Sequence, residues 1–259
     1  MLTDSHTHLL RLNVSPEEAV KEARDAGVEA IVNIGTTVAD SRAGIELAER
    51  LPGVYAVAGI HPHNADAHSQ ENLAALVELS HSGGIVALGE VGLDYYRNEW
   101  PKEMQRPLFD DVVSIANQVR LPLVIHTRNA FSDTMDALTA ARVPTVLHCF
   151  EGGESEFREA IERDCYIGLT GNVTYRNNPT ADFVHLVPED RLMVETDAPY
   201  LSPTLLRGKP NAPKNVVHTA RFLADRLGVS EKDFAERTTR NARAFYGLDR
   251  LADPPATDA

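Results

Sequence analysis

The chain has 259 residues, with 38 Asp and Glu against 25 Lys and Arg, which gives a formal net charge of −13. This acidic balance excludes nucleic-acid binders that neutralise phosphates with a broad basic surface, although it allows a small, focused site. With 43% hydrophobic and 24% charged residues, the chain has the composition of an ordinary folded protein and is too apolar to be disordered.

The two cysteines, Cys149 and Cys165, lie in apolar stretches and are too few for a disulfide framework, which favours a reducing environment. The first residues lack the basic start and the apolar run of a secretion signal, and no later run approaches the length of a membrane span. We therefore expect a cytoplasmic protein with no membrane partner. The sequence does not indicate an oligomeric state, and a monomer is compatible with it.

Short β-rich runs alternate with segments of helical spacing from the first residues onward. Eight runs are predicted as strands: 3–6, 28–34, 54–60, 85–88, 121–125, 145–147, 165–169 and 192–195. The intervening segments carry apolar residues three and four positions apart, as helices that cover one face of a sheet do. We predict helices at 16–26, where a capping-box pattern starts at Ser15, at 72–79 and at 103–119.

Apolar parallel strands joined by helices are typical of α/β proteins. The runs recur about every 27 residues, a spacing that suits a closed eight-fold barrel of roughly 250 residues. An open doubly wound sheet is the alternative, but it would carry a glycine-rich phosphate turn where His6, Thr7 and His8 stand. We predict an α/β fold, a single (β/α)8 TIM barrel over residues 1–250. Closing helices are expected at 230–237 and 238–248, and a disordered tail at 251–259.

Catalytic groups of such barrels lie at the carboxyl ends of the strands. Six of the ten histidines and several carboxylates follow the predicted strands at this position: Asp4, His6, His8, His61, His63, Glu90, His126, His148, Glu195 and Asp197. Imidazoles and carboxylates without partners are costly inside a barrel. A shared metal would satisfy them together, so the pattern predicts a metal centre.

Residues two apart on a strand share a face, so His6 and His8 can bind one ion from the same side. Such a pair alone is more often solvated or satisfied in the core, but the other strand ends make chance alignment a poor explanation. Six candidate ligands exceed the need of one tetrahedral ion, which favours two divalent ions, Mg²⁺, Mn²⁺ or Zn²⁺. We assign the ligands as His6, His8 and Asp197 to one ion, His126 and His148 to the other, and Glu90 to the bridge.

Two ions about 3.5 to 4 Å apart activate a shared water and stabilise the charges of a displacement, so the pattern predicts hydrolysis. Asp197 is placed to accept the proton of the attacking water, and we assign the catalytic roles to Asp197 and Glu90. His61 and His63 flank a proline at the end of another strand, and we expect both to contact substrate. For His61, packing against the neighbouring strand end is the alternative.

Five motifs occur in order along the chain: DSHTHL at 4–9, GIHPH at 59–63, GEVGLDY at 89–95, HCF at 148–150 and ETDAPYL at 195–201. Together they resemble the TatD-type metal-dependent deoxyribonucleases, and the resemblance runs from residue 2 to about residue 248. It implies a (β/α)8 barrel of the amidohydrolase class. It also implies divalent-metal-dependent hydrolysis of DNA phosphodiester bonds, with 3′ to 5′ exonuclease action on single strands.

Carried over by position, the resemblance implies the same six metal ligands, and His61 and His63 match the family's substrate-side motif. Arg97 and Arg128 are candidates for bidentate phosphate contacts, with surface solvation as the alternative. Two features depart from the family. The loop at 207–213 reads RGKPNAP where the family reads RGKRNEP, and Glu151 stands where a small polar residue is usual. A carboxylate there would repel phosphate, which leaves the substrate preference open.

Two other functions compete with the nuclease. The same two-metal site could hydrolyse a cyclic amide, a lactone or a small phosphoester. Amidohydrolases often bridge their metals with a modified lysine, however, and no lysine occurs in the predicted strands. The second alternative is a non-enzymatic binding protein held together by metal, but structural sites are usually closed by protein ligands, whereas this set leaves positions open for water.

Overall fold

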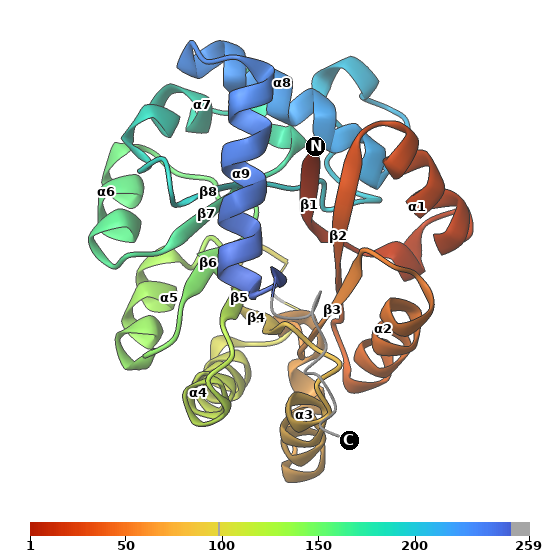
Figure 1. Cartoon of the computed structure of the whole chain (residues 1–259). Helices are drawn as coiled ribbons and strands as arrows, with labels where there is room; N and C mark the ends of the chain where they lie inside the picture. Colours follow the sequence, from red (N-terminus) through yellow and green to blue (C-terminus); the bar gives the residue numbers. More distant parts are fainter. Residues whose placement is uncertain (98, 250–259) are drawn as a thin grey trace.

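The structure is a computed structural model that describes residues 1–97 and 99–249, so the predicted tail at 251–259 lies outside the described residues. Eight parallel strands form one sheet in the order of the chain, with helices between them, which confirms the (β/α)8 barrel (Figure 1). The strands are β1 (Leu2–Thr7), β2 (Val28–Ile34), β3 (Val54–Ala58), β4 (Ala87–Asp94), β5 (Leu123–Arg128), β6 (Thr145–Leu147), β7 (Tyr166–Leu169) and β8 (Leu192–Val194).

Except for the last one, the helices cover the outside of the barrel and pack their apolar residues on the strands. They are α1 (Pro16–Asp25), α2 (Val38–Arg50), α3 (Gln70–His81), α4 (Lys102–Val119), α5 (Phe131–Ala137), α6 (Glu154–Glu162), α7 (Thr180–Phe183), α8 (Val216–Leu227) and α9 (Glu231–Tyr246). The predicted cap of α1 is present, since Ser15 Oγ accepts a hydrogen bond from Glu18 N. Of the helices described, none is both long enough and apolar enough to cross a membrane.

Hydrogen bonds of β1 and the residue after it with β8 and the residues after it close the barrel. Asp197 N donates to His6 O at 2.9 Å, and His8 N donates to Ala198 O at 2.9 Å. Ser5 Oγ adds a bond to the carbonyl of β8 at Val194, 3.0 Å long. The closure therefore places the residues that follow β8 directly beside those that end β1.

β1 extends beyond its predicted ends by one residue, and two other strands extend further. β4 was predicted at 85–88 but runs from Ala87 to Asp94, and every residue of it is buried. The prediction stopped early because glycines and carboxylates are more typical of loops than of strands. β5 likewise continues to Arg128. Glu90 and His126 therefore lie within their strands rather than at the ends. Since side chains alternate along a strand, Glu90 and Asp94 share one face.

The carboxyl-terminal segment corrects another expectation. The two helices predicted at 230–237 and 238–248 form one helix, α9, because its buried face continues across the predicted break, from Phe234 through Thr238 to Ala242. Asn241 on α9 donates to Leu192 O at 2.8 Å, and Tyr246 Oη donates to Ser5 O at 2.9 Å. This helix packs on the barrel interior and closes the amino-terminal end of the strands (Figure 1). The opposite end is left for a site.

Gly92 allows β4 and β5 to approach closely. It pairs with His126 at a φ of +145°, and a Cβ built on it would lie 2.0 Å from the carbonyl oxygen of His126. We expect Gly92→Ala to lower the free energy of unfolding by about 2 kcal/mol or more, because β5 must shift. Chemical denaturation measures this. Gly83→Ala is the control, since Gly83 also has a positive φ of +74° but nothing within 4 Å. Equal losses in both variants would contradict the steric explanation.

Candidate metal centre

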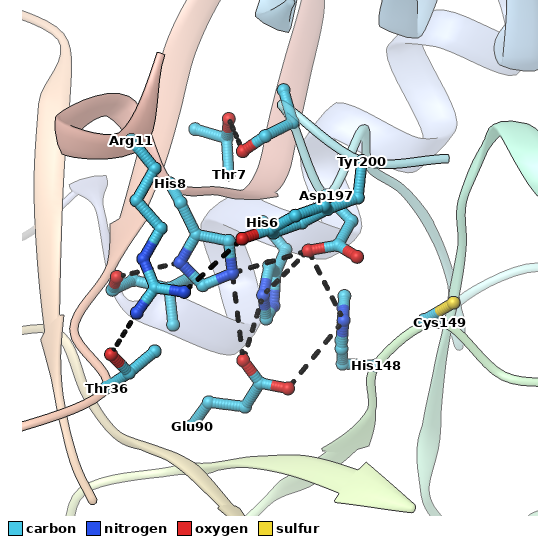
Figure 2. Close-up of polar contacts among 12 residues, drawn as sticks. His6, Thr7, His8, Arg11, Thr36, Glu90, His148, Cys149, Asp197 and Tyr200 are labelled. Atoms are coloured by element: carbon cyan, nitrogen blue, oxygen red, sulfur yellow. Dashed lines mark hydrogen bonds and ion pairs between the residues drawn. The ribbon is translucent and has the colours of Figure 1, made fainter. Parts of the chain in front are cut away.

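The six predicted metal ligands meet at the carboxyl-terminal end of the barrel. They come from β1, β4 and β5 and from the loops that follow β1, β6 and β8: His6, His8, Glu90, His126, His148 and Asp197. In Figure 2 the imidazoles of His6, His8 and His148 point toward the carboxylates of Glu90 and Asp197. The structure thus brings together residues that are spread over nearly the whole sequence.

Glu90 lies at the centre of this group and is buried. Its Oε2 faces the first strand, 3.5 Å from His6 Nε2 and 3.8 Å from His8 Nε2. Its Oε1 faces the other side, 2.8 Å from His126 Nδ1 and 3.9 Å from His148 Nε2. The two oxygens of one carboxylate therefore address two separate sets of imidazoles, which is the arrangement expected of a bridging ligand.

Asp197 completes the side that faces β1. Its Oδ1 lies 3.3 Å from His8 Nε2, 3.8 Å from His6 Nε2 and 3.9 Å from His148 Nε2. Asp4 holds the turn that carries Asp197. Its carboxylate accepts hydrogen bonds from the Thr196 backbone N at 2.8 Å and from the Thr196 hydroxyl at 2.6 Å. Asp4 therefore fixes the position of the Asp197 backbone.

Three of the imidazoles are oriented by oxygens outside the centre. His8 Nδ1 lies 3.1 Å from the carbonyl oxygen of Ile34, His148 Nδ1 lies 2.6 Å from Glu195 Oε1, and His126 Nε2 lies 3.0 Å from Asp94 Oδ2. In each ring the other nitrogen faces Glu90. Metal-binding histidines are held in this way, with one nitrogen on an outer oxygen and the other on the ion.

His6 gives an independent indication of a metal. Its ring is fully buried and stacks on His148 with 3.4 Å between ring centroids. Within the described residues neither of its nitrogens has a hydrogen-bond partner, and a buried unsatisfied nitrogen is costly. Burial and the neighbouring His148 lower the pKa of His6, which favours the neutral form that binds metals. The residues present therefore fit divalent ions.

The carboxylates are held in the charged form that metal binding requires. Burial alone would raise the pKa of Glu90, but the surrounding imidazoles, with His61 first, outweigh it and hold the pKa well below its ordinary value. The pKa of Asp197 is lowered against burial by His8 and His148. Glu195 raises the pKa of His148 to about 10 although burial opposes it.

The residues predicted to contact substrate fall in different places. His61 is buried with its Nε2 3.5 Å from Glu90 Oε1, so it joins the centre itself. His63 lies farther out and bonds through Nε2 to Asp94 Oδ2 at 2.8 Å. Arg97 is exposed at the mouth, and the guanidinium of Arg128 lies 3.9 Å from the ring centroid of Tyr96. Their substrate contacts remain predictions.

Asp94 is a buried member of the site that the strand-end argument missed. Its carboxylate joins His63 and His126 and also accepts bonds from the backbone N of Tyr96 and of Arg97. The hydrogen bonds from the histidines and backbone outweigh burial and hold the pKa of Asp94 well below its ordinary value. The period of two that links Glu90, Gly92 and Asp94 could have found it.

Clusters of potential ligand atoms within 4.8 Å of one another occur three times in the part of the chain that is described. They are His6 with His8 and Glu90, His6 with His148 and Glu195, and His61 with Glu90 and His126. All three overlap the centre around Glu90. In the first cluster His6 lies 3.5 Å from Glu90 Oε2, and in the third His61 lies 3.5 Å from Glu90 Oε1.

Known proteins similar to this chain include hydrolases and nucleases. The chain is 34% identical to the uncharacterized metal-dependent hydrolase YabD of Bacillus subtilis, over 96% of this chain and 100% of that protein. It is also 34% identical to the 3′-5′ ssDNA/RNA exonuclease TatD of Pantoea vagans, over 90% of this chain and 93% of that protein.

Among solved structures, the TatD homolog YJJV of Escherichia coli K12 superposes with a TM-score of 0.89 at 26% identity. The superposition covers 95% of this chain and 98% of that one. A sequence profile of the family described as TatD related DNase matches residues 3–247. The chain therefore belongs to the TatD-related DNase family.

Proposed function

We propose that this protein is a divalent-metal-dependent deoxyribonuclease that hydrolyses phosphodiester bonds of single-stranded DNA in the 3′ to 5′ direction. The observation that carries the proposal is the position of Glu90, whose two oxygens face separate sets of imidazoles. This position favours two ions over one. Family membership supports an ester-bond hydrolase, and the relative named a 3′-5′ ssDNA/RNA exonuclease supports the substrate and the direction.

In this proposal, His6, His8 and Asp197 would hold one ion, His126 and His148 would hold the other, and Glu90, which faces both sets, would contribute to both. When bound, two such ions activate a water and stabilise the charge of the attacking and leaving oxygens. Asp197 lies at the rim with Oδ1 directed at the centre, and it accepts the proton of the attacking water. The mixed imidazole and carboxylate set suits Mg²⁺, Mn²⁺ or Zn²⁺.

The mouth of the barrel also supports a nucleic-acid substrate. Exposed arginines lie on its loops and at the end of β5: Arg11, Arg97, Arg128, Arg176 and Arg207. Exposed tyrosines lie among them, with Tyr96 under Arg128 and Tyr200 bonded to Arg11. Guanidinium groups bind phosphates and aromatic rings stack on bases. The acidic excess of the chain therefore coexists with a local set of groups suited to a phosphodiester.

A two-metal hydrolase of a cyclic amide, a lactone or a small phosphoester is the alternative. The eight observed strands contain no lysine that could form a modified bridge, and Glu90 occupies that position. The second alternative, a non-enzymatic binding protein held together by metal, is disfavoured because the chain belongs to a family described as DNases. We also propose a cytoplasmic location, because Cys149 and Cys165 are both free thiols, the state maintained in reducing compartments.

Metal removal and return test the proposed function. Protein stripped by a chelator should not cleave a single-stranded oligonucleotide, and Mg²⁺, Mn²⁺ or Zn²⁺ should restore cleavage, because the centre needs its ions to activate water. Gel analysis with a 5′ label should show stepwise shortening from the 3′ end. Parallel incubations contain a dihydropyrimidine and a lactone. If the protein hydrolysed the dihydropyrimidine or the lactone and left DNA intact with every metal, the nuclease proposal would be wrong. The hydrolase of a cyclic amide or a lactone would then be favoured.

A further inference from the structure

A cavity of about 690 Å³ lies at the barrel mouth beside the metal centre. Its walls come from the loops after β6, β7 and β8, and its first wall residue, Glu151, follows His148 by three positions. The volume falls within the range of small-molecule sites and is sufficient for a nucleotide unit. The metal centre uses none of the residues that line this cavity, and of the groups named for the proposed function only Arg176 and Arg207 belong to it.

Glu151 presents an oriented carboxylate to the cavity. Its Oε1 accepts a hydrogen bond from Asn172 Nδ2, and Asn172 is itself buried and held by a 2.8 Å bond from Thr170 Oγ1 to its Oδ1. Over residues 1–97 and 99–249, no hydrogen bond or ion pair engages Glu151 Oε2. The cavity therefore contains a carboxylate that one hydrogen bond orients and whose second oxygen can only accept hydrogen bonds.

A planar wall stands in the same cavity. The guanidinium of Arg207 lies 4.8 Å from the centroid of the Tyr175 ring, and Tyr175 Oη donates to Ser202 O at 2.8 Å. This bond fixes the tyrosine, so the pair forms a rigid surface of the kind on which nucleic-acid bases stack. Arg176, which is exposed in the same cavity, supplies a cation for the phosphate of that nucleotide.

We propose that this cavity binds one base of the single-stranded substrate and that Glu151 makes it select bases with an exocyclic amine. The amino groups of cytosine, adenine and guanine donate hydrogen bonds to a carboxylate. Uracil and thymine have a carbonyl oxygen at position 4, and their N3–H is flanked by two oxygens that repel Glu151. The inference rests on the proposed nuclease function and adds a base preference to it.

The test compares two single-stranded substrates of equal length, oligo(dC) and oligo(dU), at neutral pH. Their bases differ at the ring edge that would face Glu151. Wild-type protein with Mn²⁺ should cleave oligo(dC) with a kcat/KM about fivefold or more above that for oligo(dU). Glu151→Gln should bring the ratio to about one, because an amide both donates and accepts. Glu154→Gln is the matched control, since Glu154 is an exposed neighbour on α6 outside the cavity, and it should keep the wild-type ratio.

A second pair of variants tests the planar wall. Tyr175→Ala should raise KM for both strands by about fivefold or more, the cost of one lost stacking contact. Tyr175→Phe keeps the ring but loses the bond to Ser202 O, so it should raise KM less than Tyr175→Ala does. A wild-type ratio of one, or a ratio unchanged in Glu151→Gln, would overturn the base preference while leaving the nuclease intact. An unchanged KM in Tyr175→Ala would show that no base of the substrate stacks in this cavity. Failure to cleave either strand would instead overturn the proposed function.

Discussion

Asp197→Asn should lower kcat on single-stranded DNA by about a thousandfold or more, the range of a lost general base. The side chain keeps its shape, but the amide cannot accept the proton of water, and it binds a cation more weakly than a carboxylate does. Asp197 Oδ1 lies within 4 Å of three imidazoles, so the loss affects the whole centre. Steady-state cleavage of an end-labelled oligonucleotide measures the effect.

The fold should tolerate this change, because the backbone of Asp197 is held by its own bond to His6 O and by the Asp4 contacts to Thr196. Circular dichroism and the thermal midpoint of metal-free protein should match the wild type. Asp190→Asn is the control. Asp190 is exposed at the other end of β8, where it pairs with Arg191. Near-normal kcat in Asp197→Asn would show that Asp197 is not essential.

Glu90→Gln should reduce the bound metal from two ions per chain to at most one and should abolish turnover. A glutamine offers one carbonyl oxygen, so it cannot serve both sides of the centre as the carboxylate does. Metal analysis after dialysis and calorimetric titration with Mn²⁺ or Zn²⁺ measure the stoichiometry. The variant should also lose part of the thermal stabilisation that saturating metal gives to the wild type.

The control for this change is Glu46→Gln, since Glu46 is an exposed glutamate on α2, outside the barrel. It should bind metal and cleave DNA as the wild type does. If Glu90→Gln retained two equivalents of metal with unchanged affinity, Glu90 would not be the bridge, and the division of the ligands into two sets would need revision.

The barrel was predictable because its strands are short, apolar and regularly spaced. The ligands His6, His8 and Asp197 could be predicted as neighbours because they end the first and last strands, which a closed barrel must bring together. Asp94 was not found, because β4 was predicted to end before Glu90. Its glycines and carboxylates look like a loop when local composition is considered, but the adjacent strands keep the segment extended.

Contacts between segments far apart in the chain account for two further features that the sequence did not predict, the location of His61 and the cavity beside Glu151. The location of His61 beside Glu90 depends on the close approach of β3 and β4, where a Cβ on Gly59 would meet the backbone of Gly89 at 2.3 Å. The cavity beside Glu151 is built by three loops whose conformations depend on one another. Its tyrosine and arginine are 32 positions apart in the chain, and no local pattern connects them.

The closure between β1 and β8 has a consequence for folding. Ligands from both ends of the barrel sequence meet only when the last strand reaches the first, so most of the loop-closure entropy is lost before the complete ligand set exists. Metal bound by this set would stabilise the closed barrel, because its ligands come from both the first and the last strand regions. Its affinity is therefore coupled to the cooperative unfolding of the whole protein rather than to the fraying of one loop.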